Sequence, residues 1–162
     1  MEKTEQNILV QRLAELLSAR GETMATAESC TGGMIAAALT ALPGASAWFF
    51  GGIVSYDNSI KTKFLDVPQA ILREYGAVSK ETALIMADAA RRNLCVSHAV
   101  SVTGVAGPDG GSPEKPVGTV WIGYAVNGNL HARRNLFSGS RADIRNATVN
   151  EALRGMIALL EQ

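Results

Sequence analysis

The stretch VGTVWIGYAVNGNLHARRNLF, residues 117–137, has two runs of strand-forming residues on either side of Asn127-Gly128. An Asn-Gly pair tolerates the positive φ angles that a two-residue hairpin turn requires. The stretch therefore predicts an antiparallel hairpin with strands at 117–126 and 129–137. The hairpin comes late in the chain, after segments that alternate between helix and strand patterns. This order indicates that the hairpin joins a mostly parallel sheet of an α/β fold.

Helix and strand patterns alternate before the hairpin. The expected strands cover residues 23–27, 51–56 and 98–103, and the expected helices cover residues 5–20, 32–42, 59–65, a turn or two from 68, 79–93 and 140–160. Helices between strands indicate parallel strands joined by crossovers, to which the hairpin adds an antiparallel pair. We therefore expect a three-layer α/β/α sandwich around a mostly parallel sheet. The length of 162 residues fits a single domain, residues 1–162.

The charge balance and the cysteine content exclude several classes of partner. The chain has 15 Lys and Arg residues against 15 Asp and Glu residues, so it lacks the basic footprint that nucleic-acid binding requires. No apolar run is long enough to span a bilayer, and the opening MEKTEQ lacks the organisation of a signal peptide. The two cysteines have no metal-type spacing. We expect a cytoplasmic protein with reduced thiols and with no nucleic-acid partner, membrane partner or metal site.

Three loops that follow expected strands are rich in functional groups. They are ESCTGG at 28–33, YDNSIK at 56–61 and TGVAGPDGGSPEKP at 103–116. Ligands of open α/β sheets bind at the carboxyl ends of the strands, so the three loops would converge if their strands are parallel neighbours. The ordinary alternative is that these residues only make turns and helix caps.

A serine activated by a lysine fits the residue types in these loops. His98 and His131 both lie in expected strands outside the loops, so a Ser-His-Asp triad is not expected. If Ser29 is a nucleophile, Lys61 is the remaining base. With Asn58 as N-cap, Lys61 lies in the first turn of a helix, where the positive end of the macrodipole lowers the pKa of a lysine. The alternative is a solvated surface lysine.

Other groups in the first two loops have structural or functional interpretations, and for some of them both stay open. Tyr56 would end the second strand, with its hydroxyl either at the site or simply in water. Cys30 has no nearby histidine and is expected to be an inert packing residue. Gly32-Gly33 would leave main-chain N–H groups open at a helix start, which suits an oxyanion or a phosphate. Glu28 either anchors the loop or binds a ligand hydroxyl, and Thr31 either caps the helix or joins the site.

Four segments, AESCTGG, PGASAWFFGGIVSYDNSIK, GAVS and TGVAGPDGGSPEKPVGTVW, resemble the CinA carboxy-terminal domain family. The likeness extends from about residue 5 to 160, and the characterised members of the family include nicotinamide mononucleotide deamidases. The resemblance implies an α/β/α fold with a five-stranded mixed sheet. It also implies hydrolysis of the carboxamide of nicotinamide mononucleotide to nicotinate mononucleotide and ammonia, in pyridine nucleotide recycling, without a metal or another cofactor.

The resemblance also implies roles for individual residues. Ser29 falls on the nucleophile and Lys61 on the base, with Tyr56, Ser46 and Thr103 as supporting groups. The family's arginine near the start of the last helix matches Arg141 or Arg145, and we favour Arg141, which is nearer the helix start. The substrate-binding residues that we expect are Glu28, Thr31, Gly32, Gly33, Ser46, Gly104, Gly107, Gly110, Gly111, Arg141 and Arg145.

Two functional alternatives stay open beside the deamidase. One is a catalytically silent member of the family that keeps the nucleotide pocket and acts as a binding module. The other is an amidase for a related substrate in the same pocket. The apolar hairpin and the aromatic cluster Trp48, Phe49 and Phe50 either cover the core or pair subunits, and we expect a homodimer or a higher homo-oligomer.

Overall fold

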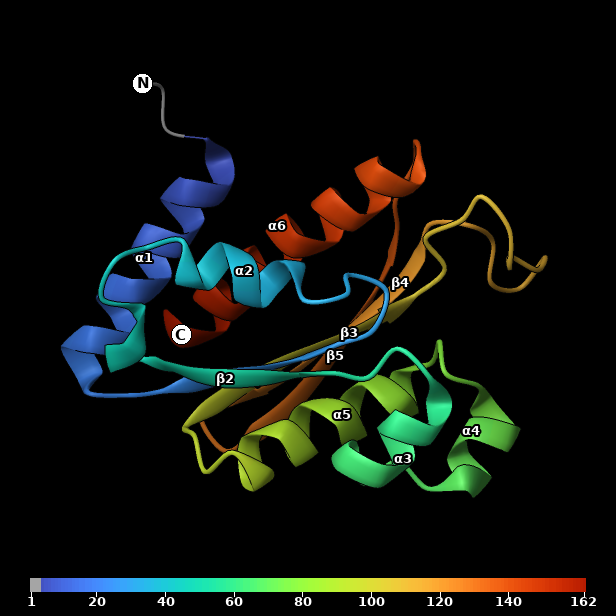
Figure 1. Cartoon of the computed structure of the whole chain (residues 1–162), viewed down its shortest axis with the longest axis horizontal. Coiled ribbons are helices and arrows are strands. Elements are labelled where there is room, and N and C mark those ends of the chain that lie inside the picture. The colour runs from blue at the N-terminus through green and yellow to red at the C-terminus, as the bar shows by residue number, and fades with distance from the viewer. Residues whose placement is uncertain (1–3) are drawn as a thin grey trace.

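The computed structural model describes residues 4–162 as one mixed β-sheet between two layers of helices (Figure 1). The sheet has five strands in the order β2-β1-β3-β4-β5. Helices α1, α2 and α6 cover one face of the sheet, and α3, α4 and α5 cover the other. In chain order the elements are α1 (Glu5–Arg20), β1 (Met24–Glu28), α2 (Met34–Thr40), the 3-10 turn η1 (Ala45–Ala47), β2 (Phe49–Val54), α3 (Asn58–Leu65), α4 (Gln69–Tyr75), α5 (Lys80–Asn93), β3 (His98–Gly104), β4 (Thr119–Val126), β5 (Asn129–Leu136) and α6 (Arg141–Leu160). The expected three-layer sandwich with a five-stranded mixed sheet is confirmed.

The sheet combines parallel and antiparallel pairs. Strand β1 pairs in parallel with both β2 and β3, whereas β4 runs antiparallel to β3 and β5. Four strands therefore share one direction. The predicted hairpin is present, and its turn residues Asn127 and Gly128 have the positive φ angles, 52° and 77°, that the sequence predicted. Strand β4 begins at Thr119 instead of 117, after Gly118, whose φ angle of 97° is not that of a strand.

The core consists of two apolar clusters, one on each face of the sheet. The larger cluster packs the sheet against α1, α2 and α6, and includes Leu13, Ile35 and Leu153. The smaller cluster packs the opposite face against α3 and α5, and includes Leu65 and Met86. All five residues of β1 are buried, as expected for a central strand covered on both faces. Within residues 4–162, no helix has both the length and the apolar character needed to cross a membrane.

Several predicted boundaries were wrong by one or two residues, and two of them affect the site. The second strand covers Phe49–Val54 instead of 51–56, so Tyr56 lies in the loop after the strand and does not end it. Helix α3 is capped by Asp57 instead of Asn58, because the Asp57 carboxylate accepts a hydrogen bond from the Ser59 N–H at 2.8 Å. The predicted helix starts at 79 and 140 are confirmed, with Ser79 and Ser140 as the N-caps of α5 and α6.

Candidate active site

Three loops meet where the parallel strands β2, β1 and β3 end. Because these neighbouring strands run in the same direction, the loops that follow them emerge side by side, as the sequence predicted. The loops border a cavity of about 200 Å³. Its lining residues are Ser29, Cys30, Tyr56, Asn58, Lys61, Ala77, Val78, Thr103, Gly104, Ala106 and Arg141. The cavity thus combines groups from the three loops with the α4–α5 connection and the start of α6.

Lys61 reaches from α3 to Ser29. Its Nζ donates hydrogen bonds to Ser29 Oγ at 3.1 Å, to the Ser55 carbonyl at 2.7 Å and to the Tyr56 carbonyl at 3.3 Å. The side chain is only 1% exposed, so Lys61 is not a solvated surface lysine. No carboxylate in the described part of the chain forms a salt bridge with this amine.

Burial lowers the pKa of Lys61 below its ordinary value of 10.5, because the charged ammonium loses hydration inside the protein. The charge of nearby Asp57 acts in the opposite direction and is the smaller influence. From the sequence, we expected the positive end of the helix dipole to lower the pKa of Lys61. In the structure, burial is the main cause. A lower pKa increases the fraction of neutral amine near neutral pH, and only the neutral amine can accept a proton.

Glu28 anchors the turn that carries Ser29. The buried Glu28 carboxylate accepts hydrogen bonds from Thr31 Oγ1 at 2.6 Å, from the Ile35 N–H at 2.8 Å and from the Ala36 N–H at 3.0 Å. It therefore satisfies the first turn of α2, where the N-cap residue offers no side-chain oxygen. Neither Glu28 nor Thr31 lines the cavity, since their polar atoms bind one another and the helix. These contacts match the anchoring role of Glu28 and the capping role of Thr31, which the sequence left open beside substrate binding.

The two glycines after Thr31 form a tight turn before α2 instead of its first helical residues. Gly32 and Gly33 have φ angles of 60° and 103°, in the left-handed region that favours glycine. The Gly32 N–H donates to the Ser29 carbonyl at 3.0 Å, and α2 begins at Met34. The turn brings the chain back on itself, so that Ser29 lies between the end of β1 and the start of α2.

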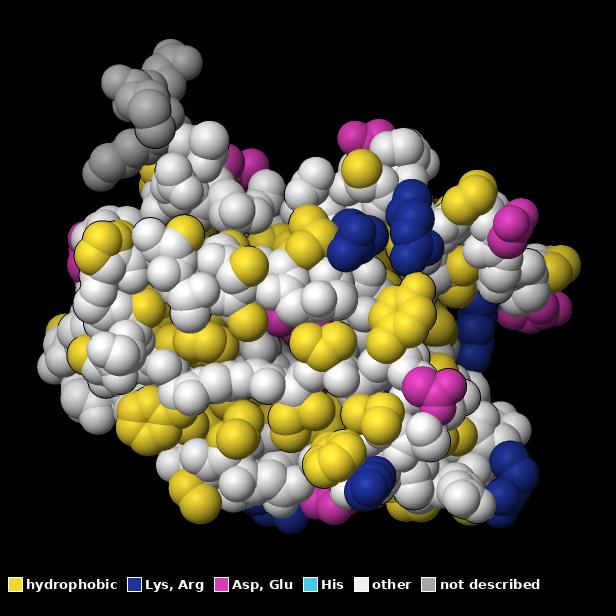
Figure 2. Space-filling model, viewed as in Figure 1, with side chains coloured by type: hydrophobic (Ala, Val, Ile, Leu, Met, Phe, Trp, Pro, Cys, Tyr) yellow, Lys and Arg dark blue, Asp and Glu magenta, His cyan; other side chains and the backbone are white. Residues whose placement is uncertain are grey.

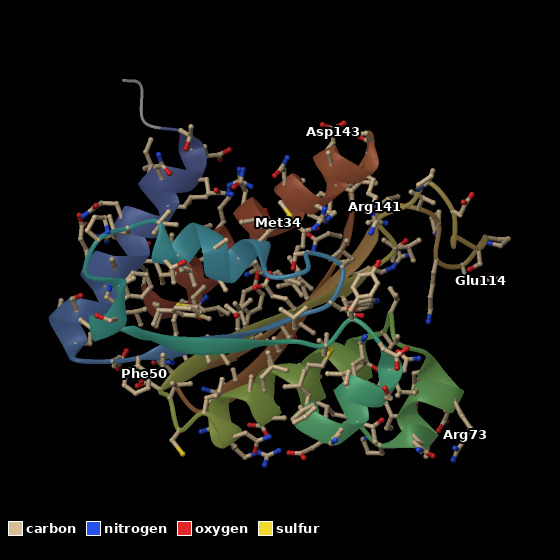
Figure 3. The ribbon with its side chains drawn as sticks, viewed as in Figure 1. Met34, Phe50, Arg73, Glu114, Arg141 and Asp143 are labelled. Carbon is tan, nitrogen blue, oxygen red and sulfur yellow. The ribbon has the colours of Figure 1, made fainter. Side chains whose placement is uncertain are left out.

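Arg141 and Arg145 lie one turn apart on α6 but have different contacts. Arg141, labelled in Figure 3, donates to the Gly107 carbonyl at 2.8 Å and to the Tyr56 hydroxyl at 3.1 Å, and it lines the cavity. Arg145 instead donates to the carbonyls of Cys30 and Thr31 at 3.1 and 3.0 Å. Arg145 therefore binds the main chain of the turn that carries Ser29, while Arg141 lies beside the cavity.

The remaining predicted residues divide between the cavity and its surroundings. Thr103 and Gly104, at the end of β3, line the cavity, and Thr103 Oγ1 donates to the Ala77 carbonyl at 2.8 Å. Gly107 contributes its carbonyl to Arg141, whereas Gly110 and Gly111 lie further along the same loop and do not line the cavity. Ser46 is not brought to the cavity within one chain: it is exposed in η1, which precedes β2 and therefore lies at the opposite end of that strand.

Cys30 lines the cavity but is poorly suited to act as a nucleophile. Burial raises the pKa of its thiol to about 11, so the thiolate is scarce near neutral pH. Sequence reasoning missed Ser55, which contributes only a main-chain carbonyl that any residue could supply. It also missed Ala77 and Val78, although both belong to the GAVS stretch that carried part of the resemblance.

A model of the CinA C-terminal domain matches residues 6–160. The chain belongs to this family. It is 51% identical over 142 residues to a CinA-like protein of Citrifermentans bemidjiense, but the match covers 88% of this chain and only 34% of that protein. This chain thus spans about a third of the length of the CinA-like protein. By contrast, a Pseudomonas putida protein named nicotinamide-nucleotide amidohydrolase PncC is 46% identical over 151 residues, which cover 93% of this chain and 94% of that protein.

Solved structures of CinA-type proteins have the same fold over nearly their whole length. The competence/damage inducible protein CihA of Agrobacterium tumefaciens has a TM-score of 0.95 and 42% identity, covering 100% of this chain and 99% of that one. The competence damage-inducible protein A of Klebsiella pneumoniae has a TM-score of 0.94 and 32% identity, covering 99% of each chain. The loops that border the cavity therefore belong to a fold that this family shares.

Proposed function

We propose that this CinA-family protein is an amidohydrolase that converts nicotinamide mononucleotide to nicotinate mononucleotide and ammonia, with Ser29 as nucleophile and Lys61 as general base. The P. putida relative, named as a nicotinamide-nucleotide amidohydrolase, matches over nearly the full length of both chains, which supports the substrate class. The mechanism rests on the buried contact of 3.1 Å between Lys61 Nζ and Ser29 Oγ. The expected setting is pyridine nucleotide recycling in the cytoplasm.

The partners of Lys61 Nζ orient its lone pair. A neutral amine has two N–H groups and one lone pair, and the carbonyl oxygens of Ser55 and Tyr56 can only accept hydrogen bonds. These two carbonyls take the two N–H groups, so the lone pair is left for Ser29, the one partner with a hydroxyl to donate. The same three contacts satisfy the protonated amine, so a proton can move from Ser29 to Lys61 without rearrangement of the site.

Each half of the reaction needs two proton transfers at the Lys61 amine, one onto it and one from it. Lys61 takes the Ser29 proton as Oγ bonds to the carboxamide carbon, and the carbonyl oxygen becomes an oxyanion. Lys61 next gives this proton to the leaving nitrogen as the carbon–nitrogen bond breaks, which releases ammonia and leaves an acyl ester on Ser29. Water attacks the ester, again with Lys61 as base, and the Ser29 alkoxide recovers its proton as nicotinate mononucleotide leaves.

Main-chain N–H groups of the turn at residues 30–33 are the donors that we assign to the oxyanion. The Gly32 N–H already binds the Ser29 carbonyl, so the donors come from the other residues of this turn. By binding the Cys30 carbonyl, Arg145 fixes the peptide unit that carries the Thr31 N–H, and in a trans peptide this N–H points away from the carbonyl. Donors fixed before the reaction stabilise a developing negative charge most effectively.

The volume of the cavity indicates which part of the nucleotide lies inside it and which part lies at its mouth. At about 200 Å³ the cavity is smaller than the roughly 300–1,000 Å³ of common ligand pockets, so it suits the nicotinamide ring, with the ribose phosphate outside. Arg141 lies at the start of α6 with neutral partners only, the Gly107 carbonyl and the Tyr56 hydroxyl. Its guanidinium is therefore available to bind the phosphate as a fork.

Ammonia release from nicotinamide mononucleotide tests this proposal. We expect turnover by the wild type and loss of turnover in Ser29→Ala and Lys61→Ala. Lys63→Ala is the matched control, since Lys63 lies on the same helix but is exposed, and it should keep wild-type turnover. Full activity of both Ser29→Ala and Lys61→Ala would overturn the proposed pair.

The same measurements separate the two alternatives. Tight binding of nicotinamide mononucleotide by calorimetry without any ammonia release would favour a silent binding module. Ammonia release from other carboxamides, but not from nicotinamide mononucleotide, would favour an amidase for a related substrate, in which case Ser29 and Lys61 keep their roles but the substrate changes.

A further inference from the structure

The connection between α4 and α5, residues 76–79, forms one wall of the cavity. The helix before it gives this connection little apolar anchorage, because no residue of α4 is fully buried. Side chains instead bind three successive carbonyls at this point of the chain, those of Tyr75, Gly76 and Ala77. The last carbonyls of a helix have no partner within the helix, so donors from elsewhere fix the path of the chain that follows.

Two of these carbonyls bind side chains of the folded core. The Gly76 carbonyl accepts hydrogen bonds from Ser79 Oγ and Thr82 Oγ1, both at 2.9 Å. The Ala77 carbonyl accepts a hydrogen bond from Thr103 Oγ1, at the end of β3, at 2.8 Å. All three donor side chains are buried, so this part of the wall is fixed by contacts that water does not replace.

The third carbonyl binds a lysine of the loop between β3 and β4, residues 105–118. Lys115 Nζ donates to the Tyr75 carbonyl at 2.7 Å, across 40 positions of the chain. Charged side chains of both signs lie at the end of the molecule that carries this loop and α4 (Figure 2), yet Lys115 forms no salt bridge with a carboxylate of the described residues. A surface lysine ordinarily keeps its amine in water, so this main-chain partner indicates a structural tie.

The same loop carries the opposite side of the cavity mouth. The Gly107 carbonyl accepts a hydrogen bond from Arg141 at 2.8 Å, and Arg141 lines the cavity. Further along the loop, the Glu114 carbonyl accepts a hydrogen bond from Arg134 of β5 at 3.1 Å, and Figure 3 labels both Arg141 and Glu114. Lys115 therefore ties the loop that positions Arg141 to the connection that walls the cavity.

We propose that Lys115 is a positioning residue that fixes the spacing of these two walls before the substrate binds. The consequence for turnover rests on the proposed function, in which the nicotinamide ring occupies the cavity and Arg141 binds the phosphate. Without the tie, the connection and the loop would move independently, and only a fraction of the molecules would have the cavity in its binding shape. The apparent dissociation constant rises in inverse proportion to that fraction.

The loss of Lys115 should therefore change KM and leave kcat close to that of the wild type. Ser29 and Lys61 keep their places through contacts to which Lys115 does not contribute. We expect Lys115→Met to raise KM for nicotinamide mononucleotide about 3- to 30-fold in the ammonia assay. Lys115→Arg keeps a charged donor for the carbonyl and should restore KM. Lys80→Met is the matched control, because Lys80 is exposed and lines, together with Lys115, a second cavity of about 390 Å³ outside the connection.

Hydrogen exchange of the proteins without substrate tests the tie itself and does not depend on the proposed function. The Gly76 N–H binds the Leu72 carbonyl at 3.0 Å, at the end of α4. This amide, followed by NMR, should exchange faster in Lys115→Met than in the wild type or Lys80→Met, because the end of the helix opens more often. A lysine that only contacts bound ligand would leave the exchange of the free protein unchanged. Circular dichroism confirms that each variant is folded.

The outcomes separate this inference from the proposed function. Wild-type exchange at Gly76 in Lys115→Met would overturn the inference. An unchanged KM in Lys115→Met, or a loss confined to kcat, would also overturn it while the proposed function stands. If the wild type releases no ammonia from nicotinamide mononucleotide, the proposed function fails, and the exchange at Gly76 still decides whether Lys115 fixes the connection.

Discussion

Replacing Lys61 by methionine should remove most of the activity while the protein stays close to wild-type stability at pH 7. Methionine is an unbranched, flexible apolar side chain, so it can fill the buried site without bringing a charge. A positioned general base contributes about 10²–10⁴-fold to a rate, so ammonia release should fall by at least about 100-fold. Lys63→Met, on the exposed side of the same helix, is the control and should keep its activity.

The stability of Lys61→Met depends on two opposing effects. At a pH below its lowered pKa, the buried ammonium of the wild type costs about 1.4 kcal/mol for each pKa unit below the ordinary value of 10.5. The substitution relieves that cost. It also deprives the Ser55 carbonyl, 2.7 Å from Nζ, of its donor, which costs about 1–3 kcal/mol. These effects have opposite signs and partly cancel, so we expect a net change in the free energy of unfolding at pH 7 no larger than the cost of the lost donor, about 1–3 kcal/mol.

The dependence of this difference on pH has a definite sign. Between the lowered pKa of folded Lys61 and 10.5, the unfolded chain binds more protons than the folded chain, so wild-type stability rises with pH. Urea unfolding of both proteins between pH 7 and about 10 should show the wild type gaining stability relative to Lys61→Met. No such gain is expected relative to Lys63→Met. A relative loss of wild-type stability as pH rises would mean that folding raises the pKa of Lys61, and the general-base mechanism would then be refuted.

Four further substitutions test separate parts of the site. Arg141→Met should raise KM for nicotinamide mononucleotide about 10- to 100-fold in the ammonia assay, because hydrogen bonds to a charged phosphate are worth about 1.5–3 kcal/mol. An unchanged KM would mean that Arg141 does not bind the phosphate. Arg145→Met should lower kcat about 100-fold with little change in KM, because the turn would lose its brace, and a change confined to KM would contradict that role. Glu28→Ala should lower the free energy of unfolding by about 3 kcal/mol or more, because three donors lose a buried acceptor. Urea unfolding measures this loss, and a smaller value would mean that water replaces the carboxylate. Cys30→Ala should keep most of the ammonia release, because the buried thiol stays protonated, whereas complete inactivation would point to the thiol as nucleophile.

Local signals in the sequence predicted most of the fold. The Asn127-Gly128 turn fixed the hairpin, and the serines at 79 and 140 marked helix starts, because each signal depends on one or two residues and a local hydrogen bond. The second strand was placed two residues late. The prediction assigned Phe49 and Phe50 to an aromatic cluster before the strand, and the register shift beside Met24 has no local signature in the sequence.

The roles of the two arginines could not be separated from the sequence. Arg141 and Arg145 are four residues apart, so helical periodicity places both on one face of α6. Their roles differ because one turn of helix separates the level of the Gly107 carbonyl from that of the Cys30 and Thr31 carbonyls. Main-chain oxygens from distant loops decide which guanidinium is free for a ligand, and such oxygens carry no signature in the sequence.

The burial of Lys61 is the property on which the proposed chemistry depends, and it arises from the strand order. The lysine is 32 residues from Ser29 in the sequence, and the two meet because β2 and β1 are parallel neighbours whose ends share one edge of the sheet. If β2 instead paired at the far edge of the sheet, the same residue on the same helix would be solvated and mostly protonated near neutral pH. The sequence supplies an amine and a hydroxyl, and the topology supplies the desolvation that makes the amine a base.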